Sequence, residues 1–227
     1  MRTAAFFDLD GALAEGDTQF GFLGWLVGRR LGGPTGSIRP AAEKGGRLLG
    51  RMLNAATPGV SAFAFLRDTP ISLLAAMSTE FFRDSLCFRI RDRAAALVES
   101  HRSRGDLTVL VTSACEPIAL PAAEWLGIGA VMATRLLSSE GRYVCPLELP
   151  EPRGMGKRVA AERFCAEHGI SVRGSHAYCS GVRDGPLLDL VGHPVAVNPD
   201  RRLRRAAQAR GWPIIDLTGS AETQSLP

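Results

Sequence analysis

The chain has 227 residues, of which 45% are hydrophobic and 22% charged, and its formal net charge is +4. This length suits one globular domain, or one domain with an insertion, and the composition excludes a disordered, collagen-like or coiled-coil protein. The excess of positive charge is spread along the chain without a zinc-finger or similar signature, so it does not predict nucleic-acid binding.

The first expected element is a short buried strand, residues 4–7, which stops at the acidic stretch that begins with Asp8. Similar apolar runs predict further strands at residues 107–111, 176–179, 194–197 and 214–217. Helical patterns lie between them, at residues 91–104, 117–126, 157–167, 186–191 and 200–210. This alternation predicts an α/β fold with a doubly wound parallel sheet, a Rossmann-like core that binds ligands at the carboxyl ends of its strands.

The stretch from about residue 18 to residue 88 departs from this alternation. Its apolar residues recur at helical spacing, as at Phe20, Leu23 and Val27. We therefore expect a helical cap inserted at residues 18–88 and an α/β core made of residues 1–17 and 89–227.

The cysteines and the apolar runs bear on the compartment. Five cysteines are an odd number without a Cys-X-X-Cys pair, so a disulfide framework is not expected and the cytoplasm is the expected compartment. No apolar run approaches the roughly 20 residues that would span a membrane. The four histidines are scattered in sequence, so a histidine metal site is not indicated. The oligomeric state stays open.

Asp8 and Asp10 stand at the end of the first expected strand. Residues two apart in a strand point to the same side, and the turn at Gly11 would keep both carboxylates close to one pocket. Because such a pair is costly without a cation, the pattern predicts Mg²⁺, which prefers oxygen ligands and often bridges to a phosphate. The alternative is a strand end with two solvated acids.

Four short segments carry candidate chemical groups at expected strand ends or helix starts: residues 6–13 (FFDLDGAL), 110–114 (LVTSA), 154–157 (GMGK) and 178–184 (YCSGVRD). In this order they resemble the four motifs of the haloacid dehalogenase superfamily. Residues 193–200 (HPVAVNPD) are similar to the sequence that follows the fourth motif in its phosphoserine-phosphatase-like subfamily. The resemblance runs from about residue 4 to residue 216.

The resemblance implies a phosphohydrolase that acts through a covalent intermediate. Asp8 would be the nucleophile that forms an aspartyl-phosphate, and Asp10 would be the general acid and base. The hydroxyl of Thr112, with Ser113 as the fallback donor, would hold the phosphoryl group. Lys157 would neutralise the nucleophile and the phosphate.

The chain departs from the family's motifs at two positions. Ala12 stands where a threonine is usual, and Ser180 stands where the family has an aspartate that binds Mg²⁺. The implied metal site would comprise Asp8, Asp10, Ser180 and Asp184, with one anionic ligand fewer and hence weaker binding. Two functions stay open: Mg²⁺-dependent hydrolysis of a small phosphate monoester, and a catalytically degenerate member that binds a phosphorylated ligand or a partner protein.

Residues next to the first two motifs are candidates for contact with the substrate. They are Gly11, Glu15 and Asp17, together with Ser113. Asp17 followed by Thr18 is also a common helix N-cap, which is the competing interpretation for that residue. The substrate itself stays open among phosphoserine, glycerol phosphate, a lysophospholipid and a specialised metabolite phosphate.

Overall fold

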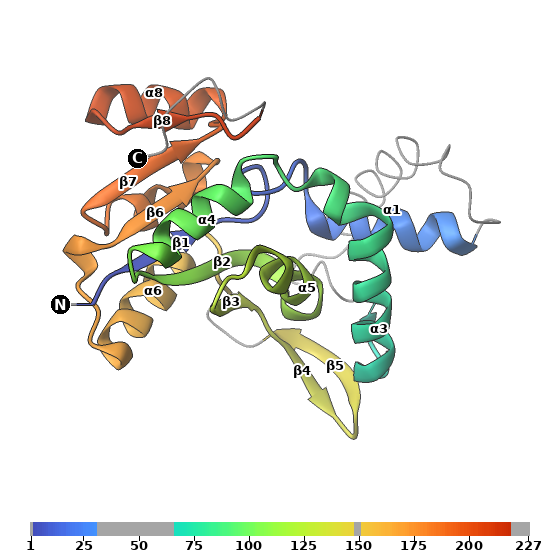
Figure 1. Ribbon diagram of the computed structural model, residues 1–227. Helices are drawn as coiled ribbons and strands as arrows, with labels where there is room; N and C mark the ends of the chain where they lie inside the picture. The colour runs from blue at the N-terminus through green and yellow to red at the C-terminus, as the bar shows by residue number, and fades with distance from the viewer. Residues whose placement is uncertain (1, 31–65, 148–150, 219–227) are drawn as a thin grey trace.

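The computed structural model describes residues 2–30, 66–147 and 151–218 of the chain (Figure 1). Its centre is a six-stranded sheet with the strand order β3-β2-β1-β6-β7-β8, and every neighbouring pair in it is parallel. The five strands expected from the sequence are all present in it. The strands are β1 (Ala4–Phe7), β2 (Leu107–Cys115), β3 (Ala130–Thr134), β6 (His176–Cys179), β7 (His193–Val197) and β8 (Ile214–Ile215).

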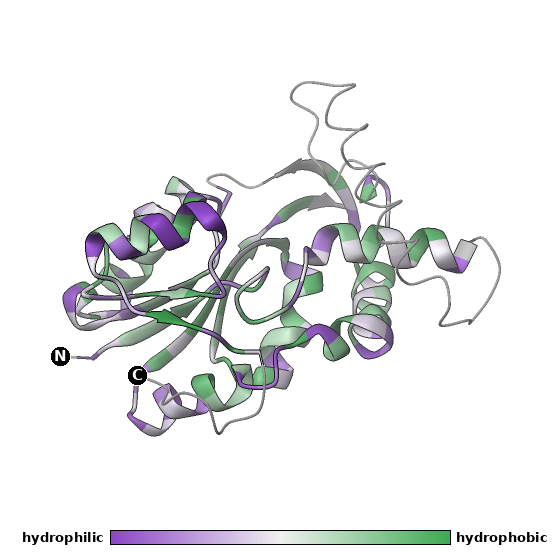
Figure 2. Ribbon diagram, turned by 90° about the horizontal axis from the view of Figure 1, so that it is seen from above, coloured by the Kyte–Doolittle hydropathy of each residue, from purple (hydrophilic) through white to green (hydrophobic). Residues whose placement is uncertain are grey.

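Helices cover both faces of the sheet, as the doubly wound fold predicted. Alternate residues of β1 serve the two faces: Phe7 packs in the cluster that includes α4 and α5, and Phe6 packs in the cluster that includes α6, α7 and α8. In Figure 2 hydrophobic segments run along the strands and hydrophilic residues gather on the outer helices. The helices are α4 (Ala94–Ser103), α5 (Glu116–Leu126), α6 (Met155–His168), α7 (Gly185–Leu188) and α8 (Arg201–Arg210), with short turns η4 (Val172–Gly174) and η5 (Val182–Asp184).

The described parts of the expected insertion are helical. Phe22 of α1 and Phe81 of α3 pack edge to face with ring centroids 5.4 Å apart, so the two helices share an apolar seam. Residues 31–65 of the predicted cap lie outside the described residues, and its extent from residue 18 to residue 88 stays a prediction. The elements are α1 (Thr18–Arg30), α3 (Ile71–Phe81), η2 (Phe82–Leu86) and η3 (Cys87–Arg89).

Three strands were not expected from the sequence: the edge strand β3 and a hairpin of β4 (Leu136–Ser139) and β5 (Arg142–Leu147). The hairpin turns at Glu140 and Gly141, which both have positive φ angles. It lies beside the start of α3 (Figure 1), where the amide of Tyr143 donates to the carbonyl of Thr69 at 3.0 Å. Strand β4 (LLSS) is mostly exposed and lacks the continuous apolar run that marks a central strand, whereas β3 (AVMAT) has a short apolar run that the sequence reasoning missed.

Candidate active site

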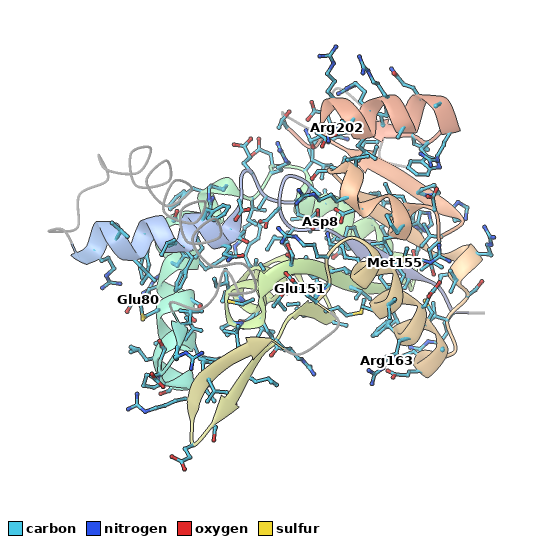
Figure 3. The ribbon with its side chains drawn as sticks, turned by 180° about the vertical axis from the view of Figure 1, so that it is seen from behind. Asp8, Glu80, Glu151, Met155, Arg163 and Arg202 are labelled. Atoms are coloured by element: carbon cyan, nitrogen blue, oxygen red, sulfur yellow. The ribbon has the colours of Figure 1, made fainter. Side chains whose placement is uncertain are left out.

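Asp8 lies at the carboxyl edge of the sheet, directly after β1. Its amide donates to the carbonyl of Tyr178 at 2.9 Å, which extends the β1–β6 ladder to the aspartate and fixes its backbone. The residue is only 5% exposed. Figure 3 shows Asp8 in the interior, near the start of the helix that begins at Met155.

Lys157, in the first turn of α6, brings a buried cation to Asp8. Its Nζ lies 2.6 Å from Asp8 Oδ1 and 3.1 Å from Asp184 Oδ1. Burial by itself disfavours an ammonium ion, but the two carboxylates hold the pKa of Lys157 above its usual value. The amine therefore stays charged, as its expected role as a counter-charge requires.

Two carboxyl groups, Asp8 and Asp184, face the single ammonium group of Lys157. Burial raises the pKa of Asp8, and the nearby carboxylate of Asp184 raises it further, although Lys157 opposes both effects. The pKa of Asp8 reaches about 8, so at neutral pH Asp8 is largely protonated and the ammonium group of Lys157 is balanced by the carboxylate of Asp184. A further positive charge, whether a metal ion or a substrate-bound cation, would stabilise the ionised form of Asp8.

Asp10 is held at the turn that follows the strand. Its Oδ1 accepts a hydrogen bond from the amide of Thr18 at 2.9 Å, at the start of α1. Desolvation and the neighbouring charge of Asp17 raise the pKa of Asp10 to about 6, against the hydrogen bonds from Thr18. A carboxyl group with a pKa near neutrality can both give and take a proton at physiological pH.

Ser180 lies against this same turn. Its hydroxyl donates to the main-chain carbonyl of Asp10 at 2.9 Å. Gly11 has a φ of 77°, and a Cβ at this position would lie 2.5 Å from Ser180 Oγ, so only glycine allows the close approach. The Ser180 oxygen still has lone pairs that can accept a hydrogen bond or bind a cation.

Thr112 and Ser113 lie further along the edge, inside β2 rather than at its end. The sequence placed the end of this strand at residue 111, but the strand continues to Cys115 with a register shift. Thr112 is fully buried, and its Oγ1 accepts from the amide of Ala114 at 3.1 Å. The hydroxyl can still donate its own proton, which fits the expected hydrogen bond to a phosphoryl oxygen. Ser113 is partly buried in the same strand.

The two acids after the first motif each have a partner in the structure. Asp17 Oδ1 accepts from the amide of Phe20 at 2.9 Å, which is the helix N-cap that competed with a substrate role. Glu15 is exposed and forms an ion pair with Arg91 at 3.2 Å. Contact of either acid with substrate stays a prediction.

Sequence reasoning missed Arg91, which it treated as the start of a helix. The guanidinium group donates to the carbonyl of Gly11 at 3.2 Å, across 80 positions of sequence. A signal was available, because an inserted segment must leave and rejoin its host domain at neighbouring points. Residues just before 18 and just after 88 therefore had to meet.

Three of the four histidines, His101, His176 and His193, gather in space although they are scattered in sequence. At the amino edge of the sheet, His101 Nδ1 lies 2.7 Å from Asp106 Oδ2 and His101 Nε2 lies 2.7 Å from the hydroxyl of Tyr178. Ligand atoms of His101, Asp106 and His176 all lie within 4.8 Å of one another. His176 begins β6 whereas Asp8 follows the end of β1, so this cluster is at the opposite edge from the carboxylates.

Comparison with known proteins places this geometry in a family. A family model described as haloacid dehalogenase-like hydrolase matches residues 5–189, which contain Asp8, Asp10, Thr112, Lys157 and Asp184. The chain belongs to this family. The match agrees with the resemblance of the four motifs, and it covers most of the α/β core.

Relatives of this hydrolase include named phosphatases. It is 33% identical to the inhibition of morphological differentiation protein of Streptomyces azureus, over 95% of this chain and 79% of that protein. It is 29% identical to a phosphoserine phosphatase of Mycobacterium tuberculosis, over 96% and 71% of the two chains. It is 28% identical to a histidinol-phosphatase of Neisseria meningitidis, over 96% and 100%. This haloacid dehalogenase-like hydrolase is a phosphohydrolase.

Solved structures share its fold. A protein of unknown function from Bordetella pertussis superposes with a TM-score of 0.82 at 31% identity, covering 96% of this chain and 99% of that chain. A phosphoserine phosphatase in apo form superposes with a TM-score of 0.63 at 16% identity, over 90% of each chain, which shows the fold alone. None of the helices in the described ranges is long and apolar enough to cross a membrane.

Proposed function

We propose that this hydrolase is a Mg²⁺-dependent phosphatase that cleaves a small phosphate monoester through an aspartyl-phosphate formed on Asp8. The observation that carries the proposal is the buried contact of 2.6 Å between Lys157 Nζ and Asp8 Oδ1, with Asp184 at 3.1 Å from the same amine. A single buried ion pair would be weak evidence for a catalytic site. Here, however, two carboxyl groups face one ammonium group at the carboxyl edge of the sheet, where ligands of such folds bind.

The reaction would proceed in two steps. In the first, a carboxylate oxygen of Asp8 attacks phosphorus and the ester oxygen leaves with a proton from Asp10. In the second, Asp10 takes a proton from a water molecule that attacks the same phosphorus, which releases phosphate and restores the Asp8 carboxylate. Lys157 and the hydroxyl of Thr112 would stabilise the charge on the phosphoryl oxygens in both steps.

The oxygen atoms near Asp8 suit Mg²⁺, a hard ion. Carboxylates of Asp8 and Asp184, oxygens of Asp10 and the hydroxyl of Ser180 would hold it. A cation there would lower the pKa of Asp8, which burial raises, and so would ionise the carboxyl group for attack. When bound, Mg²⁺ would neutralise charge on the phosphate and on the attacking carboxylate. Ser180 would contribute a neutral oxygen in place of an anionic one, so we expect weak binding.

The substrate would be a small phosphorylated molecule that is bound and recognised at the junction between core and cap. Relatives named phosphoserine phosphatase and histidinol-phosphatase support a phosphate monoester of this size. Gly11 and Ser113 would approach the phosphate, and Glu15 or Asp17 would contact the rest of the molecule. The cap, residues 18–88, would cover the site and exclude water during phosphoryl transfer.

The proposed compartment is the cytoplasm, and the proposed partners do not include nucleic acid. Four cysteines in the described ranges are free thiols, and three of them are buried, which suits a reducing environment: Cys87, Cys115, Cys165 and Cys179.

One observation favours the alternative function, a degenerate member that binds a phosphorylated ligand without turnover. Ser180 uses its hydroxyl proton to hold the carbonyl of Asp10, so this position already has a structural role that needs no metal. Binding would then rest on Lys157 and the hydroxyl of Thr112.

A panel of phosphate monoesters, assayed for phosphate release with Mg²⁺ and with a chelator, tests both functions. The Asp8→Asn variant, purified in parallel, controls for contaminating phosphatase. The proposal expects Mg²⁺-dependent release by the wild type only. No release from any ester, together with calorimetric binding of a phosphorylated ligand that survives chelation, would establish the degenerate binder instead.

A further inference from the structure

The segment that rejoins the core after the cap is paired with the loop that follows the catalytic strand. Ala14 and Ile90 form an antiparallel bridge. On either side of it, the amide of Glu15 donates to the carbonyl of Arg89 at 2.8 Å, and the amide of Arg91 donates to the carbonyl of Leu13 at 2.9 Å. The loop that carries Asp10 is thus fastened to residues 89–91 by main-chain bonds.

Arg91 adds a side-chain connection to this pairing. One nitrogen of its guanidinium donates to the carbonyl of Gly11 at 3.2 Å, and another lies 3.2 Å from the carboxylate of Glu15. The side chain is only 11% exposed. The forked group therefore joins two points of one loop, four residues apart, and the planar geometry of arginine suits this task better than a lysine does.

Two consecutive carbonyl groups of the turn accept hydrogen bonds from side chains of distant segments. Ser180 donates to the carbonyl of Asp10, and Arg91 donates to the carbonyl of Gly11. Ala12 supplies no hydroxyl of its own. Within the turn, the amide of Gly11 also donates to the carbonyl of Ala14 at 2.8 Å.

We propose that Arg91 is a positioning residue for Asp10, because it fixes the Gly11 carbonyl and with it the direction of the Asp10 carboxyl group. Arg91 touches neither substrate nor the reacting atoms. Its effect on turnover rests on the proposed function, in which Asp10 transfers a proton to the leaving group. Its effect on the geometry of the turn does not depend on that function.

The expected effect follows from the sensitivity of proton transfer to geometry. Arg91→Gln removes the fork and frees the Gly11 carbonyl, so kcat should fall by about 10- to 100-fold, the scale of a misplacement of about 1 Å. KM should change much less than kcat, because Lys157 and Thr112, which would hold the phosphoryl group, are unchanged, and a contact of Glu15 with the substrate would affect KM alone. Arg91→Lys keeps the charge and one donor, so it should recover part of the lost kcat.

Arg93 provides a matched control on the same segment. Its guanidinium also donates to a main-chain carbonyl, that of Asp216 at 3.1 Å, but this bond leads to the carboxyl-terminal part of the sheet. Arg93→Gln should therefore cost stability without changing kcat. Urea unfolding of each variant identifies conditions in which all of them are fully folded.

The experiment measures kcat, KM and amide hydrogen exchange of residues 10–15 in wild type, Arg91→Gln, Arg91→Lys and Arg93→Gln. Faster exchange of the turn in Arg91→Gln alone, with a loss of kcat that exceeds any change in KM, supports the positioning role. A kcat within twofold of wild type, or equal losses in Arg91→Gln and Arg93→Gln, overturns it. If wild type releases no phosphate, the proposed function fails while the exchange data still decide whether Arg91 holds the turn: unchanged exchange rejects it and faster exchange supports it.

Discussion

The two edges of the central sheet each bury a cluster of ionisable groups, and the clusters differ in how their central group is paired. At the amino edge, both ring nitrogens of His101 have a partner, Asp106 on one side and Tyr178 on the other. At the carboxyl edge, Asp8 and Asp184 compete for the single amine of Lys157. The first cluster satisfies both nitrogens of His101, although Nδ1 of its neighbour His176 is buried without a hydrogen-bond partner among the residues that the structure describes. In the second, the pKa of Asp8 is raised to about 8, so a bound cation would be needed to ionise both carboxyl groups at neutral pH.

Tyr178 contacts both clusters and so connects the two edges of the sheet. Its hydroxyl reaches His101, its ring stacks on Phe7 with centroids 5.1 Å apart, and its carbonyl accepts from the amide of Asp8. The two clusters are therefore linked by one strand pair. If the interpretation is correct, substitutions at one edge should change activity and those at the other should change stability.

The largest effect is expected at Asp8. Asp8→Asn removes the nucleophile, so kcat should fall by at least about 10³-fold. The free energy of unfolding should stay the same or rise, because the amide relieves the repulsion with Asp184 and leaves Lys157 one carboxylate. Phosphate release and urea unfolding of the same preparation give both quantities. Residual activity within a few-fold of wild type would exclude the covalent mechanism.

The next effect concerns the metal affinity of the carboxyl edge. Ser180→Asp places an anionic ligand at this position, so Mg²⁺ should bind at least about tenfold more tightly. The change also removes the hydroxyl that donates to the Asp10 carbonyl. Without Mg²⁺ the variant should be less stable than wild type, since a carboxylate would then face a carbonyl oxygen. Calorimetric Mg²⁺ titration measures the first effect and urea unfolding the second.

Ser180→Ala is the control, because it removes the hydrogen bond to Asp10 without adding charge. Its Mg²⁺ affinity should not exceed that of wild type. Equal Mg²⁺ affinity in wild type and Ser180→Asp would show that residue 180 does not occupy a ligand position, and the assignment of the fourth motif would then be wrong.

The carboxyl edge could be predicted in outline because its residues follow recognisable strands. Asp8 and Ser180 stand directly after apolar runs that the sequence marks as buried strands, and parallel strands bring their ends together. The contact between Lys157 and Asp8 spans 149 positions and followed from the order of the motifs. Their chemical roles stay predictions.

The rest could not be predicted because it depends on contacts that have no local pattern. His101 and His176 meet because a helix end and a strand start lie at the same edge, and nothing in their spacing indicates this. The strand β3 is an exception, because its sequence AVMAT is a short apolar run that could have been recognised. The bond from Arg91 to Gly11 needed the geometry of the cap junction, which only a three-dimensional structure supplies.

A smaller effect is expected from Tyr178→Phe. This change removes the hydroxyl 2.7 Å from His101 Nε2 and leaves that buried nitrogen, among the described side chains, with only the guanidinium group of Arg104 at 3.2 Å, which should lower the free energy of unfolding by about 1 kcal/mol. The Tyr178 carbonyl that holds Asp8 is unchanged, so kcat should stay within about twofold of wild type. A large loss of activity at full folding would show that the two edges are coupled and that the division proposed between them is wrong.

The smallest effect is the pH dependence of stability that the amino edge should produce. Burial and the neighbouring rings of His101 and His193 lower the pKa of His176 to about 4, and Arg104 acts in the same direction while Asp106 opposes it. The unfolded chain binds a proton at this histidine near pH 6.5, whereas the folded chain does not bind it until about pH 4. Stability should therefore fall as the pH drops from 6.5 towards 4, because the unfolded state binds more protons in this window.

His176→Asn removes this proton from the unfolded state, so the slope of unfolding free energy against pH near pH 5 should decrease by about one proton. His168→Asn is the matched control, since His168 is exposed on α6 outside the cluster and its loss should leave that slope unchanged. Urea unfolding at roughly pH 4.5, 5.5, 6.5 and 7.5 measures the slope in all three proteins. This range covers most of the interval between the pKa of His176 in the folded chain and its pKa in the unfolded chain. The same slope in wild type and His176→Asn would mean that His176 is protonated in the folded chain, and the amino edge would then carry an unbalanced charge.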